Sequence, residues 1–380
     1  MNILTLDYET TTHENGNFHS NKNKAVCLGY NVSGYYTNCT FELNNLNNGV
    51  CPNSDYLLLF DLVVAFNAKF ELGWSRRLGF ALPKVVWCVQ LAEYMLDRQN
   101  PYPSLEETAK KYGLSSKLDV VKTEYWDKGL DTTDVPQEIL AEYCIRDVDL
   151  IYSIYLLQRN QFEQRPQLYR LFKLACQDLL TLHEMEWNGL PFNEQLCKER
   201  AEECQKEIET ITAVLSSVYP DVPLNFNSGD QLSAFLYGGT VVQTVKQPVG
   251  VFKTGERKGQ VKFQNVDIEH KLPRLVEPLK NSELKKPGFY ATDEGTLKKL
   301  KGPFAKKYVS LILRLARLDK LVGTYYEGLP KLNKTMDWNE GMLYPNYNQC
   351  VTQTGRLSSS RPNGQNLAGD IADVIVSIYE

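Results

Sequence analysis

The chain opens with Met1-Asn-Ile-Leu-Thr-Leu-Asp7-Tyr-Glu9-Thr10, an apolar run that predicts a β-strand and carries two acids near its end. Residues i and i+2 of a strand point to the same face, so Asp7 and Glu9 would lie side by side and repel each other. A divalent cation relieves that repulsion, because Mg²⁺ and Mn²⁺ take oxygen ligands. The pattern favours a metal site that hydrolyses phosphodiesters, and a solvated edge strand is the plainer alternative.

The composition is that of a globular protein with two or three domains: 380 residues, 43% hydrophobic and 23% charged. The N-terminus has no signal-peptide pattern, and no apolar run approaches the roughly 18 residues of a membrane span, so we expect a cytoplasmic protein without a membrane partner. Nine cysteines without a Cys-x-x-Cys pair, and four histidines without metal-ligand spacing, disfavour a disulfide framework, a zinc site and a His-based hydrolase. Carboxylates remain as the candidate catalytic groups.

Charge is distributed unevenly along the chain. Residues 241–335 contain 20 Lys and Arg against 9 Asp and Glu, although the formal net charge of the chain is −4. A regional positive excess of this kind indicates contact with phosphates, so a nucleic acid is a candidate partner. Lysines that only solubilise an ordinary surface are the alternative.

Hydrophobic periodicity divides the chain into an α/β part over residues 1–158 and a mainly helical part over 159–335. Within the helical part, residues 238–290 contain glycines, prolines and β-branched alternation, which predict a β-rich insertion. The expected strands are 2–6, 25–30, 56–66 and 85–89, and the expected helices are 68–79, 104–112, 137–158, a long helix that ends at Asn188-Gly189, and 304–329.

A second acid follows a later apolar strand, in the sequence Asn67-Ala-Lys-Phe70-Glu71. Asn67 and Glu71 are four residues apart at the start of a predicted helix, so they share one face, and Glu71 could approach a cation bound by Asp7 and Glu9. The alternative is that Asn67 caps the helix and Glu71 is a first-turn acid favoured by the helix dipole.

A third candidate stretch is Tyr143-Cys-Ile-Arg-Asp147, in the helix predicted over 137–158. Tyr143 and Asp147 lie one turn apart on one face, which would place a metal-binding carboxylate beside a phenol that orients a water molecule. Asp149 lies on a different face of the same helix and is expected to be a surface acid.

The three stretches resemble, in order and spacing, the motifs of the 3′→5′ proofreading exonucleases of the tyrosine-bearing (DEDDy) type. This resemblance implies a ribonuclease H-like mixed sheet with flanking helices, and two Mg²⁺ or Mn²⁺ ions for which Tyr143 orients the attacking water. The implied metal ligands are Asp7, Glu9, Glu71 and Asp147. The family usually carries Asp where this chain has Glu71, so rate or metal preference is expected to be altered while activity survives.

The helical part resembles the thumb of family A (polymerase I-like) DNA polymerases, at residues 184–191, 225–232 and 320–325. A more specific likeness is QTGRLSSSRPNGQN at residues 353–366, which is similar to the segment of that family that holds the primer–template duplex. Gly364 stands where Leu is usual and is expected to loosen local packing. The implied DNA-binding residues are Asn67, Phe70, Lys320, Thr324, Thr354, Arg356, Ser358, Ser359, Asn363, Gln365 and Asn366.

Residues 336–380 resemble the start of the polymerase palm, and the chain stops about where the family's first catalytic aspartate would follow. The resemblance fits phage-type members best, since no 5′-nuclease domain precedes residue 1, and it implies the cytoplasm of a bacterial host. We therefore expect a 3′→5′ exodeoxyribonuclease that forms part of a DNA-directed DNA polymerase and does not polymerise by itself. A second chain with palm and fingers would complete a split polymerase, and a truncated product is the alternative.

Two other functions stay open at this stage. One is a stand-alone 3′→5′ exonuclease that acts on RNA or damaged DNA. The other is a non-catalytic DNA-binding scaffold or processivity subunit, which the departure at Glu71 favours. The insertion over 238–290 is a candidate docking site for a processivity partner, or it wraps DNA itself.

Overall fold

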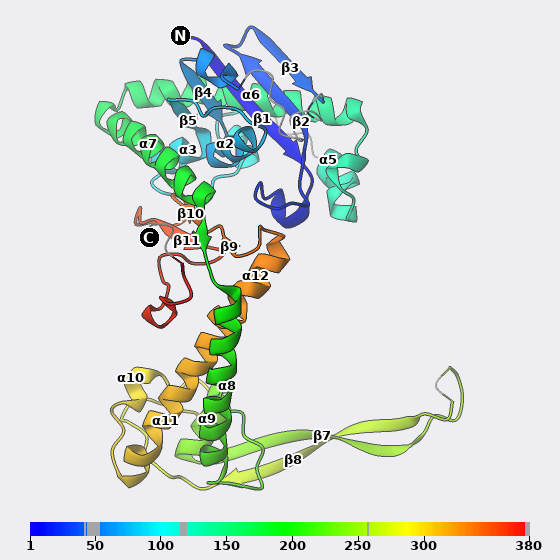
Figure 1. Ribbon diagram of the computed structural model, residues 1–380, viewed down its shortest axis with the longest axis vertical. Coiled ribbons are helices and arrows are strands. Elements are labelled where there is room, and N and C mark those ends of the chain that lie inside the picture. Colours follow the sequence, from blue (N-terminus) through cyan, green and yellow to red (C-terminus); the bar gives the residue numbers. More distant parts are fainter. Residues whose placement is uncertain (42, 44–53, 115–119, 257, 377–380) are drawn as a thin grey trace. The chain divides into compact units, whose positions relative to one another are not determined.

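The computed structural model describes residues 1–41, 43, 54–114, 120–256 and 258–376 (Figure 1). The contacts within the chain form two compact units. Unit 1 combines Met1–Glu194 with Leu329–Glu380, and unit 2 is Gln195–Gly328. The C-terminal residues therefore return to the unit that contains the N-terminus.

The centre of unit 1 is a five-stranded mixed sheet in the order β3-β2-β1-β4-β5. The antiparallel pairs are β1–β2 and β2–β3, and the parallel pairs are β1–β4 and β4–β5. This confirms the predicted α/β fold. The strands are β1 (Ile3–Thr10), β2 (Ala25–Val32), β3 (Tyr36–Thr40), β4 (Leu62–Ala65) and β5 (Val86–Cys88).

Helices pack against this sheet and against one another. The longest, α6 (Gln137–Glu163), packs against β1, β2 and β3. It comes close to β2 at Gly29, where a Cβ atom would lie 2.7 Å from the Sγ of Cys144. The other helices of the α/β part are α2 (Ala68–Arg77), α3 (Val89–Leu96), α4 (Leu105–Lys111) and α5 (Val120–Glu124).

Helix α7 (Pro166–Asn188) ends before Gly189, as the sequence predicts, but it packs in unit 1 against α2, α3 and β5. Aromatic contacts hold it there: the ring of Trp87 on β5 lies 4.6 Å from that of Phe172 and 6.1 Å from that of Tyr169. The predicted boundary at 158/159 therefore differs from the boundary of the contact units, which follows Glu194. Helical periodicity cannot distinguish a helix on a sheet from one in a separate bundle.

Strand β3 and helix α3 are two of the elements of the α/β part that escaped prediction, and the five-residue helix α5 is another. Strand β3 is short and only partly buried, so it lacks a hydrophobic face. Helix α3 begins at Val89, directly after β5, so its first residue was counted in the strand predicted over 85–89. Both are cases in which a short element depends on its neighbours for packing.

The C-terminal part of unit 1 adds short strands and a helix. Strand β6 (Leu190–Pro191) pairs with β9 (Met342–Leu343), and β10 (Asn346–Asn348) pairs with β11 (Ser358–Ser360). Helix α12 (Gly328–Met336) starts this part of the chain. The predicted boundary at 335/336 thus lies at the end of a helix whose residues belong almost wholly to unit 1.

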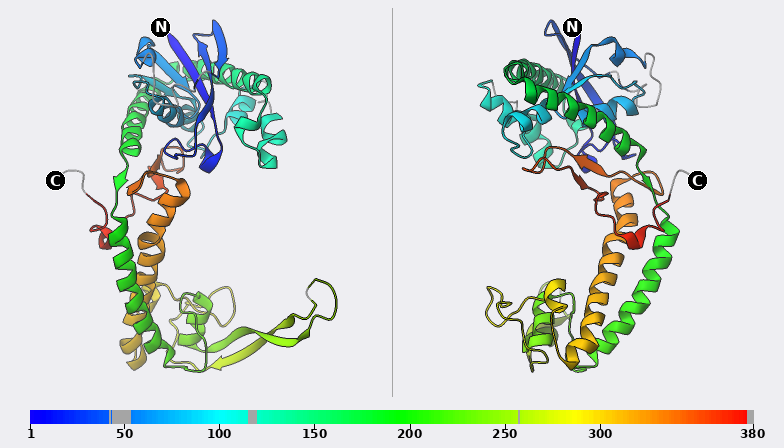
Figure 2. Two further views of the ribbon diagram at one scale, coloured as in Figure 1. Left: turned by 45° about the vertical axis from the view of Figure 1, so that its right-hand side comes forward. Right: turned by 90° about the vertical axis from the view of Figure 1, so that its left-hand side faces the viewer.

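Unit 2 is mainly helical, as predicted, and contains one long hairpin (Figure 2). Strands β7 (Gly239–Val251) and β8 (Val261–Leu272) pair antiparallel from Gly239↔Leu272 to Val251↔Val261, which confirms β structure in the insertion. Its helices are α8 (Glu194–Ser216), α9 (Gly229–Tyr237), α10 (Glu294–Leu297) and α11 (Pro303–Lys320), and the π-helical turn η5 (Leu321–Tyr326) follows.

Two findings concern the whole described chain. The eight described cysteines form no disulfide, and Cys51 lies outside the described residues. Of the helices that the structure describes, none combines the length and the apolar character needed to cross a bilayer.

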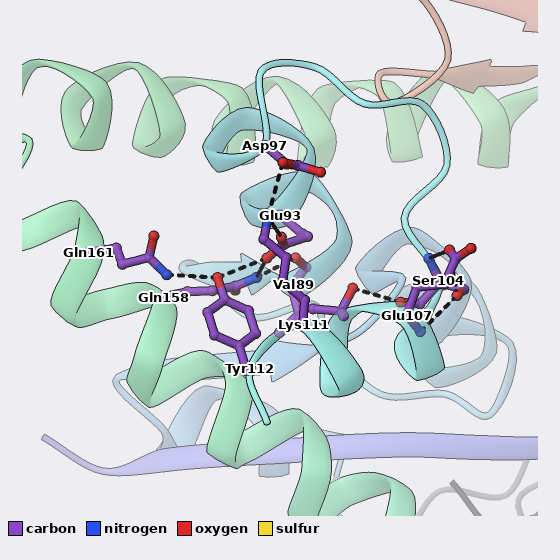
Figure 3. A network of polar contacts seen from close by, with 10 residues as sticks. Val89, Glu93, Asp97, Ser104, Glu107, Lys111, Tyr112, Gln158 and Gln161 are labelled. Atoms are coloured by element: carbon purple, nitrogen blue, oxygen red, sulfur yellow. Dashed lines mark hydrogen bonds and ion pairs between the residues drawn. The ribbon is translucent and has the colours of Figure 1, made fainter. Parts of the chain in front are cut away.

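A buried carboxylate joins three helices of unit 1 (Figure 3). Glu93 on α3 is 2% exposed and accepts from Lys111 Nζ at 2.6 Å, Tyr112 Oη at 2.9 Å and Gln158 Nε2 at 3.1 Å. The amide of Gln158 is itself fully buried and also donates to the carbonyl of Val89. Each polar group of this network therefore depends on the others for its hydrogen bonds.

We predict that Glu93→Ala lowers the free energy of unfolding by about 2–4 kcal/mol, because it leaves buried donors without an acceptor. Urea denaturation followed by circular dichroism measures the change. Glu106→Ala, at an exposed position on α4, is the matched control and should change stability by less than about 0.5 kcal/mol. Equal effects of the two substitutions would contradict a special role of the network.

Candidate active site

The site is built on the second half of β1. Asp7 and Glu9 lie opposite Gly29 and Cys27 of β2, and the register shifts by one residue after Glu9. Pairing of β1 with β4 ends at Thr5, so the strand continues past its parallel neighbour. A bulge beside a stretch of strand that is paired on one side only is a common way to direct side chains into a site.

Glu71 reaches this stretch from the first turn of α2. The backbone amide of Tyr8 donates to Oε2 of Glu71 at 2.9 Å, and the Glu71 side chain is 4% exposed. Burial raises the pKa of Glu71 well above its ordinary value, and the charge of Asp7 and then of Glu9 raises it further. The Glu71 carboxyl group therefore lies against the backbone between Asp7 and Glu9.

The plainer alternative for this stretch does not describe the structure. Asn67 occupies the N-cap position of α2, but its side chain makes no capping hydrogen bond. Glu71 turns into the protein rather than toward solvent, although it is in the first turn of the helix. Glu71 therefore interacts with β1. A first-turn acid that only benefits from the helix dipole would not need such contacts.

Helix α6 supplies the remaining two residues. Tyr143 is 2% exposed and Asp147 is 1% exposed. The pKa of Tyr143 is raised, first by burial and then by the negative charges of Glu9, Asp147 and Asp7. The phenol therefore keeps its proton beside these acids and is able to donate a hydrogen bond.

Asp149 follows the expectation of a surface acid with a structural role. It is exposed, and its Oδ1 accepts from Asn31 Nδ2 at 3.0 Å and from Thr37 Oγ1 at 2.6 Å. These bonds hold α6 against β2 and β3. They also fix the face of α6 that carries Tyr143 and Asp147 toward β1.

The structure thus gathers the five predicted residues in unit 1, from three elements: Asp7, Glu9, Glu71, Tyr143 and Asp147. Four of them are carboxylates, and burial together with the charges of Asp7 and Glu9 raises the pKa of Glu71. Carboxylate oxygens are the ligands that hard divalent cations such as Mg²⁺ or Mn²⁺ prefer, and the Sγ of Cys144 lies within 4.8 Å of the carboxylates of Asp7 and Glu9.

The residues expected to contact duplex DNA lie in both units. Lys320 and Thr324 are exposed in unit 2, on α11 and η5. Thr354, Arg356, Asn363, Gln365 and Asn366 are exposed in unit 1. The backbone carbonyl of Arg356 accepts from Thr352 Oγ1 at 2.7 Å, which orders the loop that presents its guanidinium.

Ser359 differs from its neighbours in this segment. It is 9% exposed, its hydroxyl accepts from the amide of Gly364 at 3.0 Å, and it donates to the carbonyl of Pro362 at 3.4 Å. Its hydroxyl therefore holds the loop together. At Gly364 a Cβ atom would lie 2.9 Å from the hydroxyl oxygen of Tyr347, so the glycine permits close packing instead of loosening it.

Sequence reasoning missed a buried ion pair next to Phe70. Lys69 on α2 contacts the carboxylate of Glu186 on α7 and the carbonyl of Tyr347 on β10, and the amide of Tyr347 donates to Glu186 at 2.6 Å. This cluster joins the α/β part to the C-terminal strands of unit 1. Lys69 stands inside the Asn67-x-Lys69-Phe70 sequence, but nothing local identifies its partners.

The same region contains a cavity of about 310 Å³. Asn67 and Phe70 line it from α2, and Asn346 and Arg361 line it from the C-terminal part. All lie within unit 1. The cavity therefore connects one of the predicted exonuclease motifs with the segment that resembles the duplex grip.

Comparison with known proteins concerns the C-terminal part most directly. Residues 262–374 match the sequence profile described as DNA polymerase family A. DNA polymerase I of Synechocystis sp. is 28% identical over 306 residues, which cover 79% of this chain and 26% of that protein. DNA polymerase I of Bacillus subtilis is 26% identical over 306 residues, which cover 80% and 29%.

The chain is similar to family A DNA polymerases. A solved structure, the POL domain of Pol1 from M. smegmatis in complex with DNA primer-template and dNTP, agrees with a TM-score of 0.64 at 16% identity, over 97% of this chain and 52% of that one. At this identity the likeness supports the fold. The chain spans roughly a quarter of the length of the curated relatives described above, which are bacterial.

We predict that, at a pH above the raised pKa of Glu71, Glu71→Gln stabilises the metal-free protein by on the order of 1 kcal/mol, because it removes a buried charge that Asp7 and Glu9 repel. A glutamine oxygen can still accept from the Tyr8 amide. Denaturation in EDTA measures the effect, with Glu142→Gln, at an exposed position on α6, as the matched control. A less stable Glu71→Gln protein would mean that the carboxylates do not repel one another in the folded state.

Proposed function

We propose that the chain is the 3′→5′ exonuclease and DNA-binding portion of a family A DNA polymerase. The observation that carries the proposal is the convergence of four carboxylates and one phenol from β1, α2 and α6. The match of residues 262–374 to the family supports the polymerase part. Removal of a 3′-terminal nucleotide by hydrolysis is the chemistry that this set of groups fits best.

The proposed chemistry assigns the metal ions to one set of ligands, namely Asp7, Glu9, Glu71 and Asp147. Divalent ions bound there would lower the pKa of water and stabilise the leaving oxygen. Tyr143 keeps its proton beside the acids and orients the attacking water through its hydroxyl. The Tyr8 amide fixes the position of Glu71, so that its longer side chain serves where the family usually has Asp.

The cavity beside α2 is the proposed place for the 3′-terminal bases. Phe70 is partly exposed there and offers a ring for stacking, which accepts any base. Asn67 is exposed at the same wall and offers an amide to the sugar or base. Phe70 belongs to the helix that also carries Glu71, and Asn67 is the N-cap residue of that helix.

Arg356 and the exposed polar residues of 354–366 are the proposed duplex contacts of unit 1, and Lys320 and Thr324 are separate proposed DNA contacts of unit 2. Such contacts go to phosphates and sugars and do not read sequence. A second chain that carries palm and fingers is a prediction from the sequence. A processivity partner, a phage origin and action in the host cytoplasm remain predictions from sequence.

A stand-alone exonuclease and a non-catalytic scaffold are the competing functions. The family match over residues 262–374 favours a polymerase component over a stand-alone exonuclease, which has no need of a duplex grip. The close fit of Glu71 between Tyr8, Asp7 and Glu9 favours a working site over a decayed one. Hydrolysis of DNA by the purified chain would distinguish a working site from a decayed one.

We expect the purified chain to shorten a 5′-labelled single-stranded DNA from its 3′ end in Mg²⁺. A ladder of products on a denaturing gel shows the reaction, and EDTA or the Asp7→Ala/Glu9→Ala variant should abolish it. The Glu142→Gln variant should leave it unchanged. Absence of products with both Mg²⁺ and Mn²⁺ would reject the exonuclease and favour the scaffold.

We expect Arg356→Ala to weaken binding of a primer–template duplex and to reduce the slope of log K against log salt by about 1, because one phosphate contact is lost. Fluorescence anisotropy over a salt series measures both quantities. Arg170→Ala, at an exposed position on α7, is the matched control. Unchanged affinity and slope in Arg356→Ala would exclude this residue from the duplex contact.

A further inference from the structure

Three cysteines that are far apart in sequence meet behind the acidic site. Cys27 lies on β2, Cys39 on β3 and Cys144 on α6. Their three Sγ atoms all lie within 4.8 Å of one another. Nothing in their sequence spacing indicates a metal site, because each comes from a different element of the fold.

The geometry is close to that of a metal–thiolate centre. In a tetrahedral zinc site the Zn–S bonds are about 2.3 Å long, which places the sulfurs roughly 3.8 Å apart. Small side-chain rotations would bring three sulfurs that are already within 4.8 Å to that spacing. Cys27 and Cys144 are buried, while Cys39 is partly exposed and gives an ion access from solvent.

Apolar packing by itself is a weaker explanation for this arrangement. Thiols do pack as small apolar groups, and Val121, Leu140 and Tyr143 surround these cysteines. Packing, however, does not require the polar ends of three side chains from three elements to point at one place. Soft thiolates at one point are what zinc and similar ions select.

We propose that Cys27, Cys39 and Cys144 bind one thiophilic divalent cation such as Zn²⁺. Binding converts three thiols to thiolates and releases three protons to solvent. Water would take the fourth position. Cys144 also lies within 4.8 Å of the carboxylates of Asp7 and Glu9, so the thiol site adjoins the acidic site without sharing its oxygen ligands.

A first test uses Co²⁺ as the probe with the reduced full chain under anaerobic conditions. Three thiolates give Co²⁺ an intense sulfur-to-metal charge-transfer band, whereas Co²⁺ held by carboxylates gives none, so the acidic site does not interfere. We expect one equivalent to saturate the band and Zn²⁺ to abolish it. Cys39→Ser should weaken binding by at least about tenfold, and Cys204→Ser, at a partly exposed cysteine of unit 2, should not.

A second test needs no variant and therefore does not depend on folding of a substituted protein. Iodoacetamide labelling with peptide mass spectrometry compares Cys39 with Cys204, which are both partly exposed. Zn²⁺ should slow labelling of Cys39 by at least about tenfold and leave Cys204 unchanged. A wild-type protein without the charge-transfer band, or equal labelling of Cys39 with and without Zn²⁺, overturns the proposal whether or not the chain is an exonuclease.

Discussion

The hydrogen bond from the Tyr8 amide to Glu71 is the interaction on which the acidic site depends. Pairing of β1 with β4 ends at Thr5, so the backbone beyond it needs another acceptor, and α2 provides one. That acceptor is a buried acid next to two further acids, and burial and their charges raise its pKa. Burial of like charges is costly, and the site is therefore held together by its surrounding fold rather than by its own contacts.

The parts of the site that sequence predicted are those set by local geometry. Asp7 and Glu9 share a strand face, Tyr143 and Asp147 share a helix face, and periods of 2.0 and 3.6 residues make both inferences sound. The parts that sequence did not predict depend on distant partners. Lys69 meets Glu186 and Tyr347, and Cys27 meets Cys39 and Cys144, only after the chain has folded. No local pattern encodes such meetings.

The segment over residues 353–366 is a second case in which sequence alone does not predict the role of each residue. Ser358, Ser359 and Ser360 look equivalent in sequence, yet β11 turns Ser359 inward while Ser360 is exposed. Alternation along a strand decides which hydroxyl holds the loop and which faces solvent. Sequence also does not reveal why residue 364 is a glycine. In the structure the Tyr347 hydroxyl occupies the space that a side chain at this position would need.

This geometry gives a physical reason for a glutamate at position 71, where the motif that it resembles usually has aspartate. A carboxylate on the first turn of α2 has to cross from the helix to the amide of Tyr8, and Oε2 of Glu71 does so at 2.9 Å. Aspartate is shorter by one methylene, so from the same backbone position it would not reach that amide without movement of α2. Movement of α2 is opposed by the buried contacts of Lys69 with Glu186 and Tyr347. In this chain the longer acid and the position of α2 therefore suit each other, and a shorter acid would leave the amide beyond Thr5 without its acceptor.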